Sequence, residues 1–452
     1  MKTTVGILTA LLMGICQFAH AQVKLEGAGG AALEQLAGTK TLVTVVLKSG
    51  ARDENLYVNE VGDDFLSVMT SIGSVYPYLF SSISSIVVQN GEVDKAPFKL
   101  QARAVLSTDQ QQVLQHTLDR VSTVFDQSAN DQGLRMQAAR LLAVAGEGTA
   151  RSDAVKYLEA LHNSNELHVR LQAAEQLYLA GELDEASPLI AAGLEHGNRR
   201  VRALATKMAG LTNDQSAVPI IRKMLDDRSA DYWVPAARSL ALMGYKDDIS
   251  KMTRVLFENN ENKAAAAVFA LNTLGDASLA ASLKNELQST TGMPRFRLAQ
   301  VLYALNDEKG EELLREYLEV PTLAFQAAVI LGRDGEILAQ RELRNRINAK
   351  YDPIESSMLW RTQAAAALLE GGDRTATSVL QEALRSDFLN IQITACILIT
   401  DIGDRVLIPI LQPTIEAENT ELSIFASQAV VALSDPAFRD RIIRSWQAVG
   451  AI

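Results

Sequence analysis

The chain has 452 residues, of which 48% are hydrophobic and 21% charged, and this composition is that of a folded globular protein rather than a disordered or collagen-like one. Its 43 Lys and Arg residues against 54 Asp and Glu residues give a net charge of −11. That charge, together with only 6% aromatic residues, argues against general affinity for nucleic acid or for anionic membranes.

Residues 1–21 have the order of a secretory signal peptide. Lys2 supplies the positive charge, an apolar run covers Val5–Phe18, and Ala19-His20-Ala21 forms a small-x-small cleavage site. We therefore expect export to the periplasm or the medium, with a mature chain that begins at Gln22.

The two cysteines support the same interpretation. Lipidation of Cys16 is disfavoured, because Ile15 is too large for the residue that precedes a lipidated cysteine. Cleavage would leave Cys396 without a partner, and its apolar helical surroundings predict a buried, inert thiol. No later apolar stretch is long enough to span a membrane without charged or turn residues.

The periodicity of the hydrophobic residues changes near residue 100 and divides the mature chain. We expect a linker with a short helix at 22–38, a small β domain at 39–92, a second linker at 93–103 and a helical domain at 104–452.

Between residues 41 and 88, short β-rich runs alternate with Gly/Asp turns, which predicts a five-stranded barrel of about fifty residues. A short helix, a Val-x-Val-x-Leu-x-x-Gly strand, a Gly-Asp-Asp-Phe turn and an Ile-x-x-Ile strand resemble the Sm-like small barrel over residues 31–88, and more loosely an SH3-like barrel. Glu54 and Asn55 stand where Sm-like chains usually bend at a glycine. Sm-like barrels often form RNA-binding rings, but export and the acidic residues here favour a protein-contact or capping module over an RNA binder.

From about residue 104 onward, the sequence repeats with a spacing of 31 to 32 residues. Val169, Val201 and Trp233 hold equivalent places, and Pro188 and Pro219 fit the first turn of the other helix of the repeat. Glycines suited to helix C-termini recur at Gly181, Gly244, Gly275, Gly371 and Gly403. We therefore predict an α-solenoid of about ten two-helix units, whose second helices begin near residues 134, 169, 201, 233, 264, 296, 324, 360, 391 and 422.

One segment carries a family resemblance. Asp214–Gly244 has an Ala-Val-Pro-Ile-Ile first helix, a Leu-Asp-Asp exit and an Ala-Ala-x-x-Leu-Ala second helix, and it resembles the HEAT repeat of the bilin-lyase (PBS-lyase) type. The resemblance extends over residues 104–450 and implies a mainly α fold, an α-α superhelix. Repeats of this type serve scaffolds, adaptors, inhibitors and a few enzymes, so the resemblance implies more about fold than about activity.

The sequence shows no constellation for catalysis, for a cofactor or for a metal. His116, His162, His168 and His196 form no HExxH or His-Glu dyad, and neither a Gly-Lys-Ser/Thr loop nor a Gly-x-Ser-x-Gly motif is present. His162 and His168 flank a turn and form at most a weak metal pair; solvated loop histidines are the favoured interpretation. We expect a non-enzymatic protein without cofactor, and a bilin-lyase-like enzyme or enzyme subunit is the alternative.

An arginine follows the first apolar residue of several second helices. The favoured interpretation is an inter-repeat ladder in which each arginine bonds to an acceptor at a neighbouring helix start, and a stripe that binds phosphate or carboxylate groups is the alternative. The arginines are Arg135, Arg170, Arg202, Arg297 and Arg361.

Second helices of HEAT stacks generally line the concave side, and those of the C-terminal half are almost free of charge. Phe269, Tyr303, Ile330 and Phe425 are therefore candidates for an apolar groove that binds a protein or peptide, unless these helices are simply packed on all sides. We expect an exported scaffold or adaptor for protein–protein interaction. An envelope assembly factor that oligomerises through the β-barrel is a further alternative.

Overall fold

The computed structural model describes residues 42–47, 52–61, 65–70, 75–79, 83–88, 106–183, 185–227, 229–348 and 355–450. The chain forms two compact units, one spanning His20–Ser107 and one that includes Thr108–Ile452. The predicted signal peptide at 1–21 and the predicted linkers at 22–38 and 93–103 lie outside the described residues.

The first unit contains an antiparallel five-stranded sheet in the order β4-β3-β2-β1-β5. Alternate residues such as Leu56 and Val58 are buried, with Tyr57 between them only partly buried, as expected for strands with one face on a core. Within the described strands, β4 and β5 are not paired with each other, so the sheet is open and the predicted barrel is not supported. The strands are β1 (Leu42–Leu47), β2 (Arg52–Val61), β3 (Phe65–Thr70), β4 (Val75–Leu79) and β5 (Ile83–Val88).

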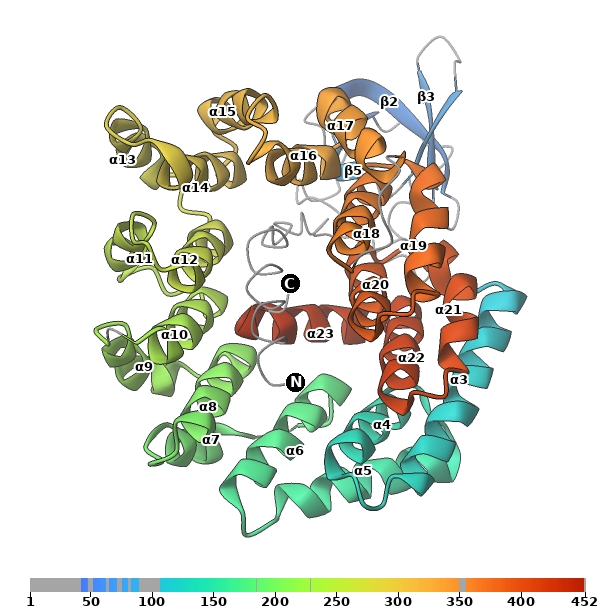
Figure 1. The fold of residues 1–452 in the computed structure, drawn as a ribbon. Coiled ribbons are helices and arrows are strands. Elements are labelled where there is room, and N and C mark those ends of the chain that lie inside the picture. The colour runs from blue at the N-terminus through green and yellow to red at the C-terminus, as the bar shows by residue number, and fades with distance from the viewer. Residues whose placement is uncertain are drawn as a thin grey trace. The chain divides into compact units, whose positions relative to one another are not determined.

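In the second unit, the described residues form ten helix pairs, which confirms the predicted helical-repeat solenoid (Figure 1). The first helices of the pairs are α3 (Thr108–Gln127), α5 (Gly148–His162), α7 (Ser187–Leu194), α9 (Val218–Met224), α11 (Ile249–Val255), α13 (Leu279–Glu286), α15 (Glu308–Leu318), α17 (Ile337–Asn348), α19 (Thr377–Leu384) and α21 (Ile408–Ile415).

The second helices, which we call the inner helices, line the inside of the ring in Figure 1. They are α4 (Gln132–Ala145), α6 (Leu167–Ala180), α8 (Arg199–Thr212), α10 (Ala230–Leu242), α12 (Glu261–Leu274), α14 (Gly292–Ala304), α16 (Ala324–Arg333), α18 (Glu355–Glu370), α20 (Leu389–Ile402) and α22 (Thr420–Ser434). Short 3-10 turns precede three first helices, at η2 (Gln215–Ala217), η3 (Arg374–Ala376) and η4 (Arg405–Leu407). None of the described helices is both long enough and apolar enough to cross a bilayer.

Local sequence signals account for most helix ends. Asp131 and Asn198 cap α4 and α8 by accepting bonds from main-chain N–H groups, and Pro188 and Pro219 lie in the first turns of α7 and α9 as predicted. Helices α6, α12 and α20 end at left-handed glycines, also as predicted.

One predicted glycine cap is displaced by a residue. The left-handed position after α18 is Gly372, with φ of 93°, and not Gly371. Gly371 is required for a different reason: a Cβ atom there would lie 2.1 Å from the main-chain oxygen of Gly332. Its lack of a side chain permits the close approach of α16 and the turn after α18.

The solenoid closes on itself, because its last repeat packs against its first (Figure 1). A continuous hydrophobic core joins Val121 and Val124 of α3 to Ile424 and Val431 of α22, and each of these four side chains is at most 2% exposed. Burial of apolar side chains of this size contributes about 1.5–3 kcal/mol each. The ring is therefore held by the same hydrophobic packing that joins neighbouring repeats.

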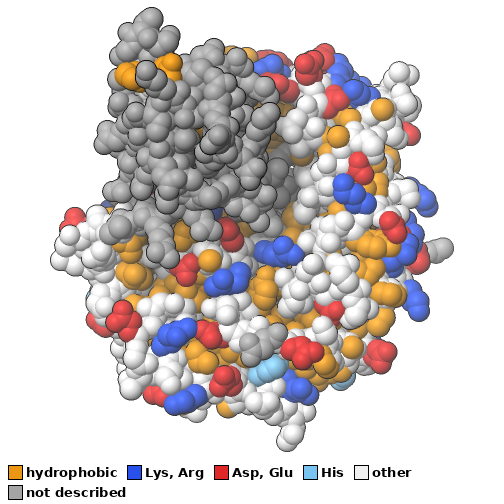
Figure 2. All heavy atoms as spheres, turned by 180° about the vertical axis from the view of Figure 1, so that it is seen from behind, with side chains coloured by type: hydrophobic (Ala, Val, Ile, Leu, Met, Phe, Trp, Pro, Cys, Tyr) orange, Lys and Arg blue, Asp and Glu red, His pale blue; other side chains and the backbone are white. Residues whose placement is uncertain are grey.

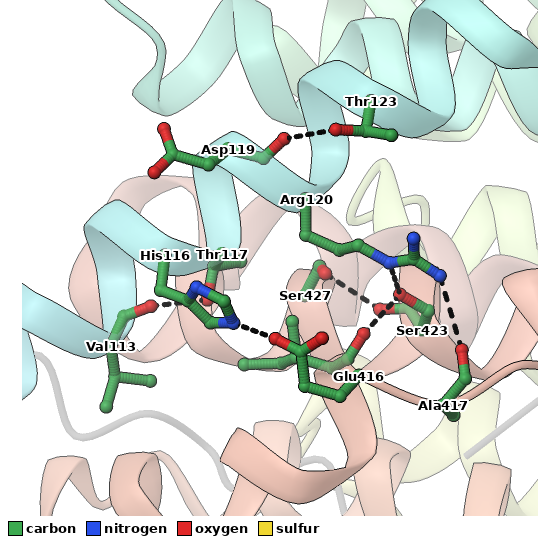
Figure 3. Close-up of polar contacts among 11 residues, drawn as sticks. Val113, His116, Thr117, Asp119, Arg120, Thr123, Glu416, Ala417, Ser423 and Ser427 are labelled. Atoms are coloured by element: carbon green, nitrogen blue, oxygen red, sulfur yellow. Dashed lines mark hydrogen bonds and ion pairs between the residues drawn. The ribbon is translucent and has the colours of Figure 1, made fainter.

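Polar contacts border this seam between α3 and the last repeat (Figure 3). His116 bonds to the carboxylate of Glu416, and Arg120 donates to the Ser423 hydroxyl and to the Ala417 carbonyl oxygen, each at 3.3 Å. Since His116 and Glu416 are well exposed, their pairing adds little to the stability of the seam.

Candidate functional site

A final helix, α23 (Pro436–Val449), lies inside the ring (Figure 1). It follows α22 after the single residue Asp435 and contacts α6, α8 and α10 as well as α22. Phe438 and Ile442 are buried in the hydrophobic core shared with the seam. The inner face of the first half of the ring is thus occupied by a helix of the same chain.

The arginines of α23 bond to main-chain carbonyls at the C-terminal ends of inner helices. These carbonyls have no partner within their own helices, and they carry the negative end of each helix dipole. Arg439 donates to Thr400 of α20 (2.8 Å), Arg441 to Leu179 of α6 (2.7 Å), and Arg444 to both Gly210 of α8 (2.9 Å) and Leu242 of α10 (2.8 Å). Helix ends, rather than carboxylates, therefore balance these cations.

Arg238 of α10 makes the reciprocal contact with the C-terminal end of α23. Its Nη1 donates to the Gln447 carbonyl oxygen at 2.7 Å, and its guanidinium lies 4.6 Å from the ring centroid of Phe269. The side chain is 1% exposed, and this burial lowers the pKa of Arg238 to about 9. Among the described residues, no carboxylate pairs with it, so the end of α23 and the aromatic face are its compensation.

A row of polar side chains from α4, α6 and α8 also faces α23. Glu175 accepts bonds from Lys207 at 2.5 Å and from the Ser445 hydroxyl of α23 at 3.1 Å. Burial by itself would raise the pKa of Glu175, but Lys207, Ser445 and Arg140 outweigh it and hold that pKa below its ordinary value. We use the name docking face for Glu175, Arg238 and the carbonyl oxygens of Leu179, Gly210 and Leu242.

The four predicted groove residues do not form an exposed groove. Phe269 is 0% exposed under Arg238, and Ile330 is 3% exposed, so neither presents surface to a partner. Tyr303 is partly buried and donates its hydroxyl to Asp334; burial and the Asp334 charge raise the pKa of Tyr303. Phe425 is partly buried on α22.

The predicted arginine ladder corresponds to several different arrangements. Arg297 bonds to Glu261 at the start of α12 in the preceding repeat, at 2.7 Å, as the ladder requires. Arg361 instead pairs with Glu382 of α19 through both terminal nitrogens, at 2.7 and 2.8 Å. The others contact the Tyr232 hydroxyl (Arg202), the His162 carbonyl (Arg170) and the rings of Phe125 and Tyr157 (Arg135).

A second set of ion pairs joins consecutive repeats and was missed by the sequence analysis. A basic residue of a first helix, or of the 3-10 turn before it, reaches an acidic residue in the loop that starts the next repeat. The recurrence of Asp in these loops at about one or two repeat lengths is the signal that could have revealed the pairs. The pairs are Arg222–Asp248 (2.6 Å), Lys284–Asp307 (2.7 Å), Arg344–Asp373 (2.6 Å) and Arg374–Asp404.

The described surface offers little for catalysis or metal binding. A pocket of about 420 Å³ between the N-terminal ends of α6 and α8 brings together His168 and His196, and His162 is not part of its lining. No cluster of three or more His, Cys, Asp or Glu side chains suited to a metal occurs in the described ranges. Cys396 is buried, and burial raises the pKa of its thiol to about 12. On the coloured part of the face in Figure 2, acidic and basic side chains are interspersed.

Paired helices stacked in this way define a helical-repeat protein, an α-solenoid. Neither a protein-family profile nor a curated protein sequence matches the chain. Among similar solved structures is the complex of CpcE and CpcF of phycocyanin lyase from Nostoc sp. PCC7120, with 18% identity, a TM-score of 0.31, and coverage of 54% of this chain and 86% of that one.

Two further solved structures are similar. The Escherichia coli protein YibA has 19% identity and a TM-score of 0.30, covering 54% of this chain and 91% of its own. An engineered protein has 18% identity and a TM-score of 0.28, covering 70% of this chain and 99% of its own.

The similarity to phycocyanin lyase corrects the expectation that this protein is not an enzyme. That expectation rested on export and on the absence of a catalytic constellation in the sequence, and a phycocyanin lyase is nevertheless among the similar structures. At 18% identity the similarity bears on fold alone and assigns no activity to this chain.

Proposed function

We propose that this is an exported HEAT-repeat protein that binds a segment of a partner protein on the inner face of its helical ring. One observation carries the proposal: the inner face already holds a helix, α23, through main-chain carbonyls and a buried polar row. Repeat proteins use such extended concave surfaces for binding. Export rests on the signal-like sequence of residues 1–21.

The inner face is suited to a peptide segment because it offers directional polar groups and apolar surface together. The carbonyl oxygens of the docking face accept bonds, Arg238 donates to a helix end, and the core beneath Phe438 and Ile442 buries apolar side chains. A small number of well-placed polar groups within an apolar surface fixes orientation without loss of affinity.

Site-specific photocrosslinking in the exporting cell tests this proposal. A photoreactive phenylalanine derivative at Tyr178, which lies on α6 beside the α23 arginines, should capture a discrete partner. The matched control is the same group at Ile337, which is 77% exposed at the start of α17. Capture from Tyr178 but not from Ile337 supports the proposal, and equal capture from both positions, or capture from Ile337 alone, overturns it.

A further inference from the structure

We infer that the docking face selects an arginine-bearing amphipathic helix, and that α23 occupies this face in competition with such a helix from a partner. The inference rests on the proposed function and adds the chemistry of the partner. The observations behind it are the hydrogen bonds and apolar contacts that hold α23 on the docking face.

The acceptors that hold the arginines of α23 are main-chain oxygens. Arg441 and Arg444 bond to three main-chain oxygens, those of Leu179, Gly210 and Leu242, and to no side chain of the docking face. Main-chain oxygens at helix ends recur with every repeat and do not depend on the identity of the residue. The chemical selectivity of these contacts therefore lies in the helix that binds, which must supply the donors.

The donors on α23 are arginine side chains. Arg444 bridges two inner helices, because its Nη2 reaches the ends of α8 and α10 at 2.9 and 2.8 Å. Residues three apart on a helix are separated by about 4.5 Å along its axis, whereas packed helices are about 8–10 Å apart. The long arginine side chain spans this difference, and its guanidinium is more weakly hydrated than a lysine ammonium, so it loses less hydration when it is buried between two helix ends.

Helix α23 also has an apolar side. The buried residues Phe438, Ile442, Ser445 and Ala448 of α23 recur at spacings of three or four and lie on one face, whereas Ile443 belongs to a separate apolar cluster with Ala366 and Leu398. Ser445 meets Glu175, and Arg238 meets the C-terminal end of the helix at Gln447. The face therefore recognises an apolar stripe, flanking arginines and a helix end together.

A helix from a partner can take the place of α23 only if the ring stays closed without it. The ring does not depend on α23 alone for closure, since Val121 and Val124 pack against Ile424 and Val431 at the seam. Only Asp435 separates α23 from α22, so a single position can act as the hinge. A chain with a net charge of −11 also favours the approach of a cationic helix from a distance.

Peptide binding to the full-length protein tests the inference. The probe is a fluorescent peptide with the sequence of residues 435–450, and its matched control carries Lys in place of Arg439, Arg441 and Arg444, which keeps the charge. In the full chain, Ile442→Asp should unseat α23. We expect the arginine peptide to bind this variant at least about tenfold more tightly than it binds the unmodified protein, and at least about tenfold more tightly than the lysine peptide does.

Circular dichroism shows whether the Ile442→Asp chain is folded. If it is not, a chain with Arg441→Ala and Arg444→Ala retains the apolar contacts of α23 and should show the same gain in peptide binding. Equal affinity for the two peptides, or no gain in a folded variant, overturns the inference. If Tyr178 captures a partner but the two peptides bind equally, the proposed function stands and the preference for arginine is wrong. If the arginine peptide binds more tightly but Tyr178 captures nothing, the preference for arginine stands and the proposed function is wrong.

Discussion

Arg140 of α4 donates a hydrogen bond to the side-chain oxygen of Gln428 of α22, across 288 positions of sequence. Its other terminal nitrogen donates to Gln176 of α6 at 2.9 Å, so one guanidinium joins the last repeat to the first two. Burial lowers the pKa of Arg140 to about 10, against the opposing effect of Glu175. A buried polar bond of this kind fixes which helices meet at the closure, because an unpaired partner would be costly.

Closure predicts that neither terminal repeat frays. In an open solenoid, the end repeats have one neighbour and open most readily, whereas here α3 and α22 are packed on both sides. Hydrogen exchange followed by mass spectrometry should show amides of α3 and α22 protected as well as those of α12. Val431→Asp, which places a charge at a 0% exposed seam position, should speed exchange in α3 first. Early exchange of α3 in the unmodified protein would contradict the closed ring.

The contact between α14 and α15 predicts a cost for a single methyl group. A Cβ atom at Gly310 would lie 2.2 Å from the main-chain nitrogen of Tyr303, whereas one at Gly197 would meet nothing within 4 Å. Gly310→Ala should lower the free energy of unfolding by about 1–3 kcal/mol, measured by urea denaturation. Gly197→Ala serves as the control and should change it little; equal effects of the two would be evidence against this packing.

The bridging role of Arg444 predicts an order among its variants. Arg444→Ala removes bonds to the ends of both α8 and α10 and should cost about 1.5–3 kcal/mol of unfolding free energy. Arg444→Lys should recover only part of that loss, because an ammonium is more strongly hydrated than a guanidinium and costs more to bury. Arg385→Ala, at an exposed position, is the control and should fall within about 0.5 kcal/mol of the unmodified protein. A fully stable Arg444→Lys variant would show that charge alone is enough.

The lowered pKa of Glu175 predicts a pH dependence of stability. Because folding holds this carboxyl ionised, its contribution is present above its ordinary pKa of 4.5 and is lost as pH falls below that value. Glu175→Gln should be less stable by about 3–5 kcal/mol at neutral pH, since it leaves Lys207 buried without a carboxylate. The difference in unfolding free energy between the two proteins should narrow below pH 4.5. A gap that stays constant from pH 7 to pH 3 would rule out this role for Glu175.

Export predicts a defined mature terminus. Intact-mass measurement of the exported protein should give a chain that begins at Gln22, with loss of ammonia if that glutamine has cyclised. Cys16→Ser should leave processing unchanged, which separates this route from lipidation. Retention of Met1, or a lipid mass on Cys16, would refute the prediction.

The sequence alone was enough for the repeated helix pairs and their approximate starts, because these follow from local chemistry. Pro188 and Pro219 lie in first turns, and left-handed glycines end α6, α12 and α20. Each of these signals acts within a few residues of the position that it fixes.

Only the tertiary structure decided what closes the ring and what fills its inner face. The apolar stripe of α3 and the arginines of α23 are visible in the sequence, but nothing local states that Val121 meets Ile424 or that Arg441 meets the end of α6. The acceptors of α23 are main-chain oxygens, which every residue carries, so no sequence pattern marks them. The sequence left open whether Phe269 lines a groove or is packed on all sides, and it is buried because Arg238 and the end of α23 come together above it in the folded ring.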